Sequence, residues 1–313
     1  MPNKIHNSNE RFLIVTADDF GMCHSMNEAI MNLYQADAIN SSMIMMPGPW
    51  AKEAAEYAKN HHNVNVGIHL TLTSSLPAYK WGPVTRSSRI QSLITAEGYF
   101  WEHAAHVEEH ATAEAIRTEI RSQIEMALTL GIEPTHLDSH EGSLLGLSRG
   151  RDFLEIVFDL CQEHRLPFKL PVNIVNQSFL DLEMRELMTE RIESARKRGI
   201  LLIDDLINLP YHLEQGEDYD IAKVKMMEAI KGVGGGITEI VIHPALNTYE
   251  MRAITPHWKK REIEYLLFMD EDIHRLLQTE KIQLTSWKDI RDRQRQASGG
   301  DTTGNPDYKC CRS

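Results

Sequence analysis

The sequence predicts an α/β fold, namely a single deformed (β/α) barrel with mostly parallel strands. Two observations carry this prediction. Short apolar segments alternate with helical segments along most of the 313 residues, and no shift in composition marks a domain boundary. This alternation is typical of a parallel sheet covered by helices. Eight strand candidates suit a closed or deformed barrel, and a doubly wound open sheet is the alternative.

The strand candidates are short and apolar. Residues 12–17 form a continuous apolar run, which is typical of a strand buried on both faces. The other candidates are residues 42–46, 64–72, 135–139, 167–170, 200–203, 238–242 and 282–285. Helices are predicted over residues 25–35, 51–59, 113–130, 152–164, 182–198, 221–230 and 259–277. The glycine-rich segment 232–236 lacks the Lys-Ser/Thr of a phosphate-binding loop and precedes a strand, so a plain turn is predicted.

The remaining segments divide into one long loop and two ends. Residues 74–101 are rich in Pro, Gly and aromatic side chains, which favours an ordered lid over the active face. We expect residues 1–10 to be a flexible N-terminus and residues 11–291 to form the barrel domain. Residues 292–313 are polar and rich in Gly and Ser, which predicts a disordered C-terminal tail.

Composition excludes several classes of protein. The net charge is -12, with 33 Lys+Arg against 45 Asp+Glu, which argues against nucleic acid or an anionic membrane as the partner. No run of 18 apolar residues is present, and the N-terminus lacks the apolar core of a signal peptide, so we expect a cytoplasmic protein. Cys23 and Cys161 are predicted to be buried thiols, and Cys310 and Cys311 to lie in a solvated tail.

Titratable residues follow four of the predicted strands. Asp18 and Asp19 follow the first, His69 ends the third, His140 follows the fourth and His243 follows the seventh. The carboxyl ends of parallel strands form the face on which α/β barrels build their active sites. We therefore expect these side chains to converge there.

Each of these signals also has a structural interpretation. An Asp-Asp pair is often a turn or a helix cap, at about even odds. However, two carboxylates directly after a buried strand are costly unless a group such as a divalent cation neutralises them. His136, Asp138 and His140 share a face in extended backbone, a spacing that suits a metal ligand and a supporting carboxylate. A polar turn after the strand is the alternative.

Four ordered motifs carry a resemblance to a known family. Ala-Asp-Asp-Phe-Gly at residues 17–21, Gly-Ile-His-Leu-Thr-Leu-Thr at 67–73, Thr-His-Leu-Asp-Ser-His at 135–140 and Ile-His-Pro at 242–244 resemble the YdjC-like carbohydrate deacetylases, which include chitooligosaccharide deacetylases. The resemblance extends over about residues 12–289. It implies a deformed barrel related to polysaccharide deacetylases, and an enzyme that hydrolyses the N-acetyl group of a sugar or oligosaccharide.

The resemblance also implies roles for single residues. Asp19, His69 and His140 would hold one divalent metal ion, Asp18 would accept a proton, and His243 would assist the leaving amine or the oxyanion. The family habit is magnesium, whereas two imidazoles and one carboxylate also suit zinc or another transition metal. A bound metal would activate the attacking water. Family members commonly form dimers, so a homodimer is among the expected assemblies.

One motif departs from the family pattern. Members often continue the third motif as Asp-Ser-His-His-His-Val-His, whereas residues 138–144 here read Asp-Ser-His-Glu-Gly-Ser-Leu. The ligand position His140 is kept, so the departure predicts a different pocket and substrate. Two other functions stay open: a carbohydrate-binding protein with altered catalysis, and another metal-dependent sugar enzyme, either an isomerase or a phosphoesterase, on the same barrel.

Overall fold

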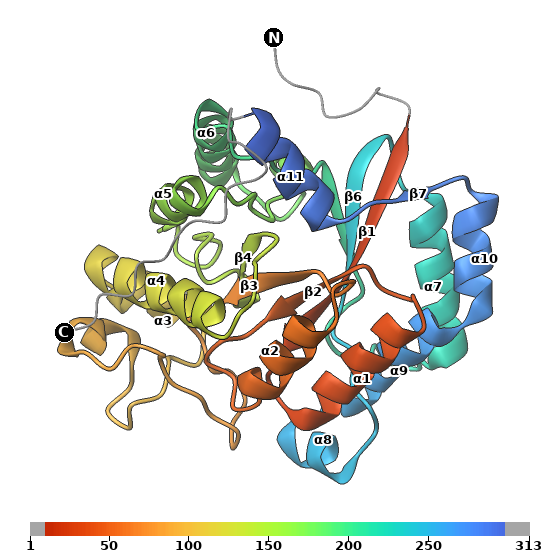
Figure 1. Cartoon of the computed structure of the whole chain (residues 1–313), viewed down its shortest axis with the longest axis horizontal. Coiled ribbons are helices and arrows are strands. Elements are labelled where there is room, and N and C mark those ends of the chain that lie inside the picture. The colour runs from red at the N-terminus through yellow and green to blue at the C-terminus, as the bar shows by residue number, and fades with distance from the viewer. Residues whose placement is uncertain (1–9, 298–313) are drawn as a thin grey trace.

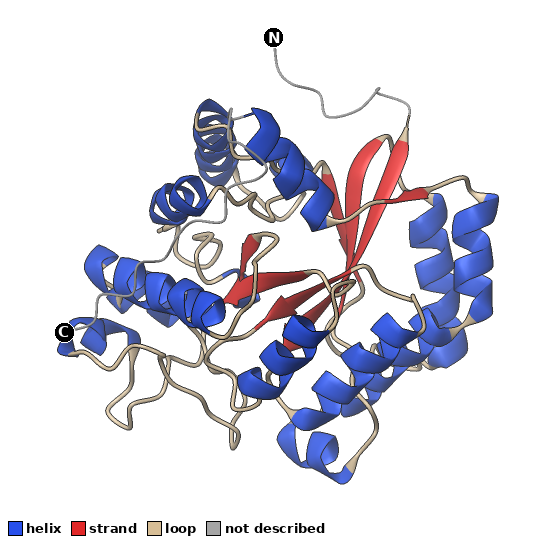
Figure 2. Ribbon diagram, viewed as in Figure 1, coloured by secondary structure: helices blue, strands red, loops and turns tan. Residues whose placement is uncertain are grey.

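The computed structural model describes residues 10–297, and their strands all run parallel within one curled sheet. The strands are β1 (Arg11–Phe20), β2 (Ser41–Ile44), β3 (Val66–Leu70), β4 (Leu137–Ser139), β5 (Asp205–Asn208), β6 (Gly236–Ile242) and β7 (Gln283–Leu284). Their order is β4-β3-β2-β1-β6-β5, and β7 also pairs with β1. Helices surround these strands on the outside (Figures 1 and 2).

Isolated bridges complete the circuit of the sheet. Leu137 of β4 bridges Phe168, and Pro171 bridges Ile203, which lies two residues before β5. Residues 168–171 therefore fill the gap between β4 and β5, and the predicted deformed barrel is confirmed. The open doubly wound alternative is wrong because both edges of the strand order are joined through this segment.

Two predicted strands differ in detail from the structure. Residues 167–170 form bridges without a continuous ladder, and the strand predicted at 200–203 lies later in the chain, as β5. The candidate at 282–285 is β7, a short strand whose pairing with β1 is confined to Phe12 and Leu13. It lies along the part of β1 that precedes the pairing with β2, which begins at Thr16.

Each predicted helical segment contains a helix, whereas the helices at residues 104–110, 249–254 and 287–297 were not predicted. The α-helices are α1 (His24–Gln35), α2 (Ala51–Asn60), α3 (Ala104–His110), α4 (Ala113–Thr129), α5 (Leu154–His164), α6 (Leu182–Lys197), α7 (Tyr219–Lys231), α8 (Tyr249–Ile254), α9 (Trp258–Met269), α10 (Glu271–Thr279) and α11 (Trp287–Ala297). Three short 3-10 helices are η1 (Ser88–Leu93), η2 (His140–Gly142) and η3 (Val172–Asn176). Side chains of Thr112, Asp181 and Asp218 cap the N-termini of α4, α6 and α7.

The structure corrects two of the predicted element boundaries. The helix predicted over 259–277 is two helices, because the side chain of Asp270 caps the start of α10 and ends the first helix. Residues 292–297 belong to α11 rather than to a disordered tail, and Arg291 and Gln294 of this helix are buried. Of the other residues predicted as flexible ends, Glu10 is described and accepts a hydrogen bond from the backbone N–H of Gly236. Residues 1–9 and 298–313, which include Cys310 and Cys311, lie outside the described residues.

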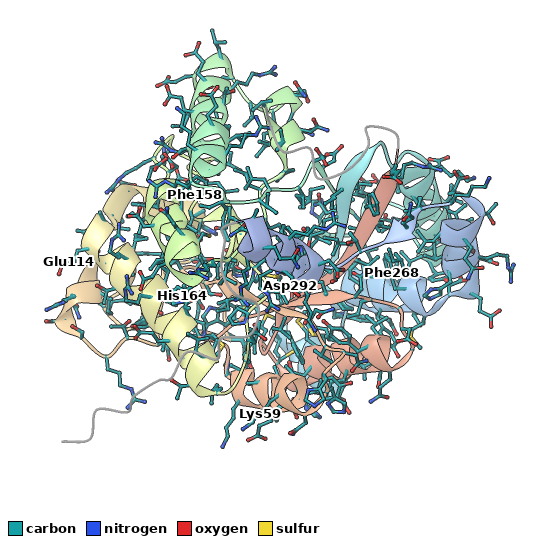
Figure 3. All side chains as sticks on the ribbon, turned by 45° about the horizontal axis from the view of Figure 1, so that its top comes forward. Lys59, Glu114, Phe158, His164, Phe268 and Asp292 are labelled. Atoms are coloured by element: carbon teal, nitrogen blue, oxygen red, sulfur yellow. The ribbon has the colours of Figure 1, made fainter. Side chains whose placement is uncertain are left out.

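Helix α11 covers the end of the barrel where the strands begin. Trp287 of α11 is fully buried, and its indole N–H donates to Glu239 of β6 over 3.0 Å. Figure 3 shows α11, which carries the labelled Asp292, lying across the middle of the molecule in front of the strands. This arrangement leaves the opposite end of the barrel, where the strands finish, for the site.

Other expectations from the sequence can be compared with the structure. Cys23 and Cys161 are both buried free thiols, as predicted. Within residues 10–297, no helix combines the length and the apolar character needed to cross a bilayer. The segment 74–101 contains η1 and two buried aromatic residues, Trp81 and Phe100, which shows that this long loop is ordered.

Candidate metal and catalytic site

The two carboxylates that end β1 point into the same cleft, although successive residues of a regular strand face opposite sides. Asp19 has a φ of 65°, which residues other than glycine rarely adopt, and the pairing of β1 with β2 shifts register between Ala17 and Phe20. Asp18 and Asp19 are both buried and both line a cleft of about 510 Å³. Neither caps a helix, because the N-cap of α1 is Cys23.

Asp19, His69 and His140 converge on one point of this cleft. Asp19 Oδ1 lies 3.6 Å from His69 Nε2 and 3.5 Å from His140 Nδ1, and these two nitrogens are 3.2 Å apart. Each side chain is buried, and Asp19 Oδ1 has no hydrogen-bond partner among the described residues. Ligands about 2.0–2.2 Å from a tetrahedral metal ion are about 3.3–3.6 Å from one another. These three residues therefore fit a divalent cation.

Asp138 orients the first imidazole of this group. Its Oδ1 lies 2.5 Å from His69 Nδ1, which leaves Nε2 turned toward Asp19. Although burial opposes a charge on His69, Asp138 and Asp18 raise the pKa of the imidazole to about 9. Asp138 itself has a pKa held below its usual range, because the charges of His69 and Lys169 outweigh the effect of burial. A carboxylate behind a ligand histidine is a common device of metal sites.

Lys169 was not among the residues predicted for the site. It lies on the bridging segment between β4 and β5, with Nζ 3.1 Å from Asp18 Oδ2 and 2.5 Å from Asp138 Oδ2. Burial would lower the pKa of this ammonium group, but the two carboxylates raise it above its ordinary value. Lys169 therefore neutralises both acids. Its signal in the sequence is a lysine within the apolar strand candidate 167–170.

Arg261 is a second cation that the sequence analysis missed. It lies on α9 and is buried, with Nη1 3.0 Å from Asp19 Oδ2. Its other terminal nitrogen donates to the hydroxyl of Tyr211, and the guanidinium group lies over the ring of Tyr211, 5.0 Å from its centre. Arg261 thus holds one oxygen of Asp19 and leaves Oδ1 free for the cation. In the sequence it resembles any charged residue of an amphipathic helix.

His243 follows β6 on another wall of the cleft, as predicted. Its backbone N–H donates to Glu264 Oε2 over 2.6 Å, and its ring Nδ1 lies 3.8 Å from the same oxygen. Burial lowers the pKa of His243 to about 4, and the charge of Asp19 does not offset this effect. Burial also raises the pKa of Glu264 to about 7. In the resting site the imidazole is therefore neutral at pH 7.

His136 lies beneath the site rather than beside the ligands. Its ring stacks on Trp287 of α11, with centroids 4.2 Å apart and planes 7° apart, and its Nδ1 is 2.9 Å from Thr135 Oγ1. Asp138 and His140, two and four residues later, both line the cleft. A role for His136 next to the ligands stays a prediction that these contacts do not support.

The predicted lid contributes one wall of the cleft. Ser75, Leu76 and Trp81 line it, and the indole N–H of Trp81 donates to the backbone oxygen of Thr73 over 2.8 Å. The edge of this indole faces the ring of His140, with ring centres 6.2 Å apart. The opposite walls are largely apolar and include Leu145, Leu147, Pro171, Ile174, Leu206 and Leu209.

The departure from the family motif changes what surrounds His140. Glu141 lines the cleft with a φ of 50°, and its Oε1 accepts a hydrogen bond from Ser75 Oγ over 2.5 Å. Ser143 and Leu144 are instead fully buried, and Ser143 Oγ donates to the backbone oxygen of His140 over 3.0 Å. Glu141, Gly142 and the buried Leu144 thus occupy the positions where family members often have imidazoles.

Comparisons with known proteins show the family of the chain. A family model described as YdjC-like protein matches residues 12–279. A protein of Thermoanaerobacter pseudethanolicus named Carbohydrate deacetylase is 26% identical over 281 residues, which cover 90% of this chain and 100% of that protein. A Thermus thermophilus protein of the same name is 29% identical over 282 residues, covering 90% of this chain and 94% of that protein.

A solved structure shares the fold. It comes from Enterococcus faecalis V583 and is named provisionally as a cellobiose-phosphate cleavage protein. It superposes with a TM-score of 0.72 at 20% sequence identity, and the match covers 90% of this chain and 99% of that chain.

Proposed function

The chain belongs to the YdjC-like protein family, and from this membership we propose that it is a carbohydrate deacetylase that removes an N-acetyl group from a sugar or oligosaccharide. One observation carries the proposal. The adjacent carboxylates Asp18 and Asp19 enter one cleft but have different partners, a lysine and an arginine respectively. This difference in partners supports two different tasks.

We assign Asp19, His69 and His140 as the residues that hold a divalent cation. The two imidazoles suit zinc, iron(II) or manganese, and magnesium is the family habit. When bound, such an ion lowers the pKa of a water molecule and polarises a carbonyl group. Its neighbours Asp138 and Arg261 orient His69 and Asp19.

Asp18 is the proposed proton acceptor. Its Oδ2 lies 3.8 Å from His69 Nε2, so it borders the cation site while Lys169 holds it from the other side. The oxygen of water forms a bond to the acetyl carbon as Asp18 takes a proton from the water. The C–N bond then breaks, and acetate and the amine leave.

His243 acts on the leaving side of the same reaction. The amine nitrogen needs a proton as the C–N bond breaks, and an imidazole suits this task. His243 is neutral in the resting site, and the nearby Glu264 has a pKa of about 7, so near neutral pH the carboxyl group carries the proton of this pair for part of the time. We propose that the imidazole of His243 takes up the proton of this pair once negative charge develops on the substrate.

The size and polarity of the cleft support a sugar substrate. A volume of about 510 Å³ is within the range of small-molecule sites, and apolar walls next to a few polar groups suit the faces and hydroxyl groups of a sugar. The two strongly basic side chains that line the cleft, Lys169 and Arg261, are both paired with carboxylates. This pairing disfavours the phosphoesterase alternative.

Acetate release from N-acetylated sugars tests the proposal. The purified protein is incubated with a broad panel of N-acetylated mono- and oligosaccharides, with and without chelator, and acetate is measured. We expect release that a chelator abolishes and added metal restores. Absence of release from the whole panel, with metal shown to be bound, would overturn the deacetylase proposal. Sugar binding without release would favour a carbohydrate-binding protein instead. The cytoplasmic location, the homodimer and the absence of nucleic-acid and membrane partners stay predictions from the sequence.

A further inference from the structure

The two candidate histidine ligands have unequal support on the side that faces away from the cation site. His69 turns Nε2 toward Asp19, and its other nitrogen is held by Asp138 at 2.5 Å. His140 turns Nδ1 toward Asp19 and His69. Its other nitrogen, Nε2, is buried and has no hydrogen-bond partner among residues 10–297. A buried polar atom without a partner is costly, so this nitrogen requires an explanation.

Glu141 lies against that nitrogen. Its Oε1 is 3.8 Å from His140 Nε2, which is about 1 Å longer than a hydrogen bond to a carboxylate. The side chain of Glu141 is 34% exposed and so has room to move. Its backbone adopts a φ of 50°, a strained conformation that persists where the surrounding structure holds it.

Other groups near the ring do not supply an acceptor for Nε2. The indole of Trp81 faces His140 but offers only an N–H group, which already donates to Thr73. Ser75 donates its hydroxyl to Glu141 and so anchors the carboxylate from the lid segment. The carboxylate of Glu141 is therefore the acceptor near His140 Nε2.

We infer that Glu141 is a positioning residue for His140. By accepting the Nε2–H of the His140 imidazole, Glu141 selects the tautomer whose Nδ1 lone pair faces the cation. Asp138 does the same for His69 through the opposite nitrogens, because it binds Nδ1 and leaves Nε2 facing the cation. This inference rests on the cation site of the proposed function. It assigns a task to the residue at which the third motif departs from the family pattern. It also connects the lid to the site, because Ser75 holds Glu141.

Cation affinity tests this role without any sugar. The affinity for Zn²⁺ and Co²⁺ is measured by competition with a chromophoric chelator, and the visible spectrum of the Co²⁺ protein reports the ligand arrangement. We expect Glu141→Ala to weaken the affinity about 10–100-fold and to change the Co²⁺ spectrum. Glu141→Gln keeps an acceptor oxygen, so it should weaken the affinity less. Ser75→Ala should have a smaller effect in the same direction.

Glu102→Gln is the matched control, because this glutamate directly follows the lid segment and only approaches Lys80, at 4.0 Å. It should bind as the wild type does. Thermal unfolding without metal shows whether each variant folds, and Glu141→Gln decides the question if Glu141→Ala does not fold. Wild-type affinity and an unchanged Co²⁺ spectrum in the Glu141 variants would overturn the inference, as would a wild-type protein that binds neither ion. Metal binding without acetate release would overturn only the proposed function.

Discussion

Nζ of Lys169 lies 3.1 Å from Oδ2 of Asp18, and the two side chains are only 8% and 6% exposed. The same ammonium group neutralises Asp138, so one cation balances two acids. We expect Lys169→Met to lower the free energy of unfolding by about 3–5 kcal/mol, because it leaves buried carboxylates without a counter-charge. Urea unfolding measures this loss. Lys223→Met, which breaks ion pairs to Asp270 and Asp272 near the surface, is the control and should stay close to wild type. Equal losses in the two variants would contradict the prediction.

The pair Asp18 and Asp19 is expected to respond differently to substitution. Asp18→Asn removes the proposed proton acceptor but no ligand, so the protein should keep its metal and lose turnover by about 10²–10⁴-fold. Asp19→Ala removes a ligand and should lose the metal. Metal content by atomic emission and acetate release together check both variants. The reverse pattern would mean that the two roles are exchanged.

His243→Ala is expected to lower kcat by about 10²–10⁴-fold while the metal content stays at the wild-type level. The reason is that the imidazole lines the cleft but is not among the three atoms that converge on the cation site. Steady-state kinetics with metal analysis of the same sample provide the measurement. A loss of metal in this variant would place His243 among the ligands instead.

Close packing around position 67 leaves no room for a side chain larger than that of glycine. A Cβ atom at this position would lie 2.4 Å from Cε1 of His136 and 2.6 Å from the sulfur of Met43. Gly67→Ala should therefore destabilise the fold by about 1–3 kcal/mol. Gly234→Ala, where a Cβ atom meets nothing within 4 Å, is the control. In a double-mutant cycle, Gly67→Ala should cost less free energy of unfolding in the His136→Ala background than in the wild type, because the clash with the imidazole is gone.

Glu239 makes stability depend on pH. It is fully buried, and burial raises its pKa from 4.5 to about 7, which corresponds to about 3 kcal/mol. The folded protein keeps this proton between pH 4.5 and 7 and unfolding releases it, so this carboxyl group lowers stability as pH rises through that window. Glu239→Gln should match the wild type at pH 4.5 and exceed it at pH 8 in urea unfolding. An equal difference at both pH values would contradict the assignment.

Most of the barrel could be predicted because its strands carry their own signal. Continuous apolar runs such as β1 are buried on both faces, and their periodicity does not depend on distant residues. The bridging segment 168–171 was harder to place because isolated bridges rather than a ladder define it. β5 was harder to place because its residues, Asp-Leu-Ile-Asn, are not fully buried and form no continuous apolar run. The break at Asp270 depends on a capping contact that competes with the propensity of the helix to continue.

Some residues of the candidate site could also be predicted from the sequence, and others could not. Asp18, His69, His140 and His243 are recognisable because polar residues at the ends of apolar strands require an explanation. Arg261 and Glu264 are not recognisable, because on α9 they resemble charged residues of an exposed face. Their place in the site comes from the docking of α9 on the barrel, where both are buried.

Backbone pairing is uneven around the barrel, because isolated bridges join the segment between β4 and β5 whereas ladders join the other strands. Asp18 and Asp19 stand near the end of β1, where its pairing with β2 shifts register. His69 stands on β3, and His243 follows β6, which pairs with β1 over seven residues. The segment with Lys169, Pro171 and the nearby Ile174 is held by single bridges and lines one side of the cleft. Its backbone also bonds to both neighbours, since the N–H of Lys169 donates to Leu137 and the N–H groups of Val172 and Asn173 donate to Ile203 and Asp204. For the proposed reaction, an outward movement of this segment would draw Lys169 away from Asp18 and Asp138, so the position of this wall is coupled to the charge balance around the proposed proton acceptor.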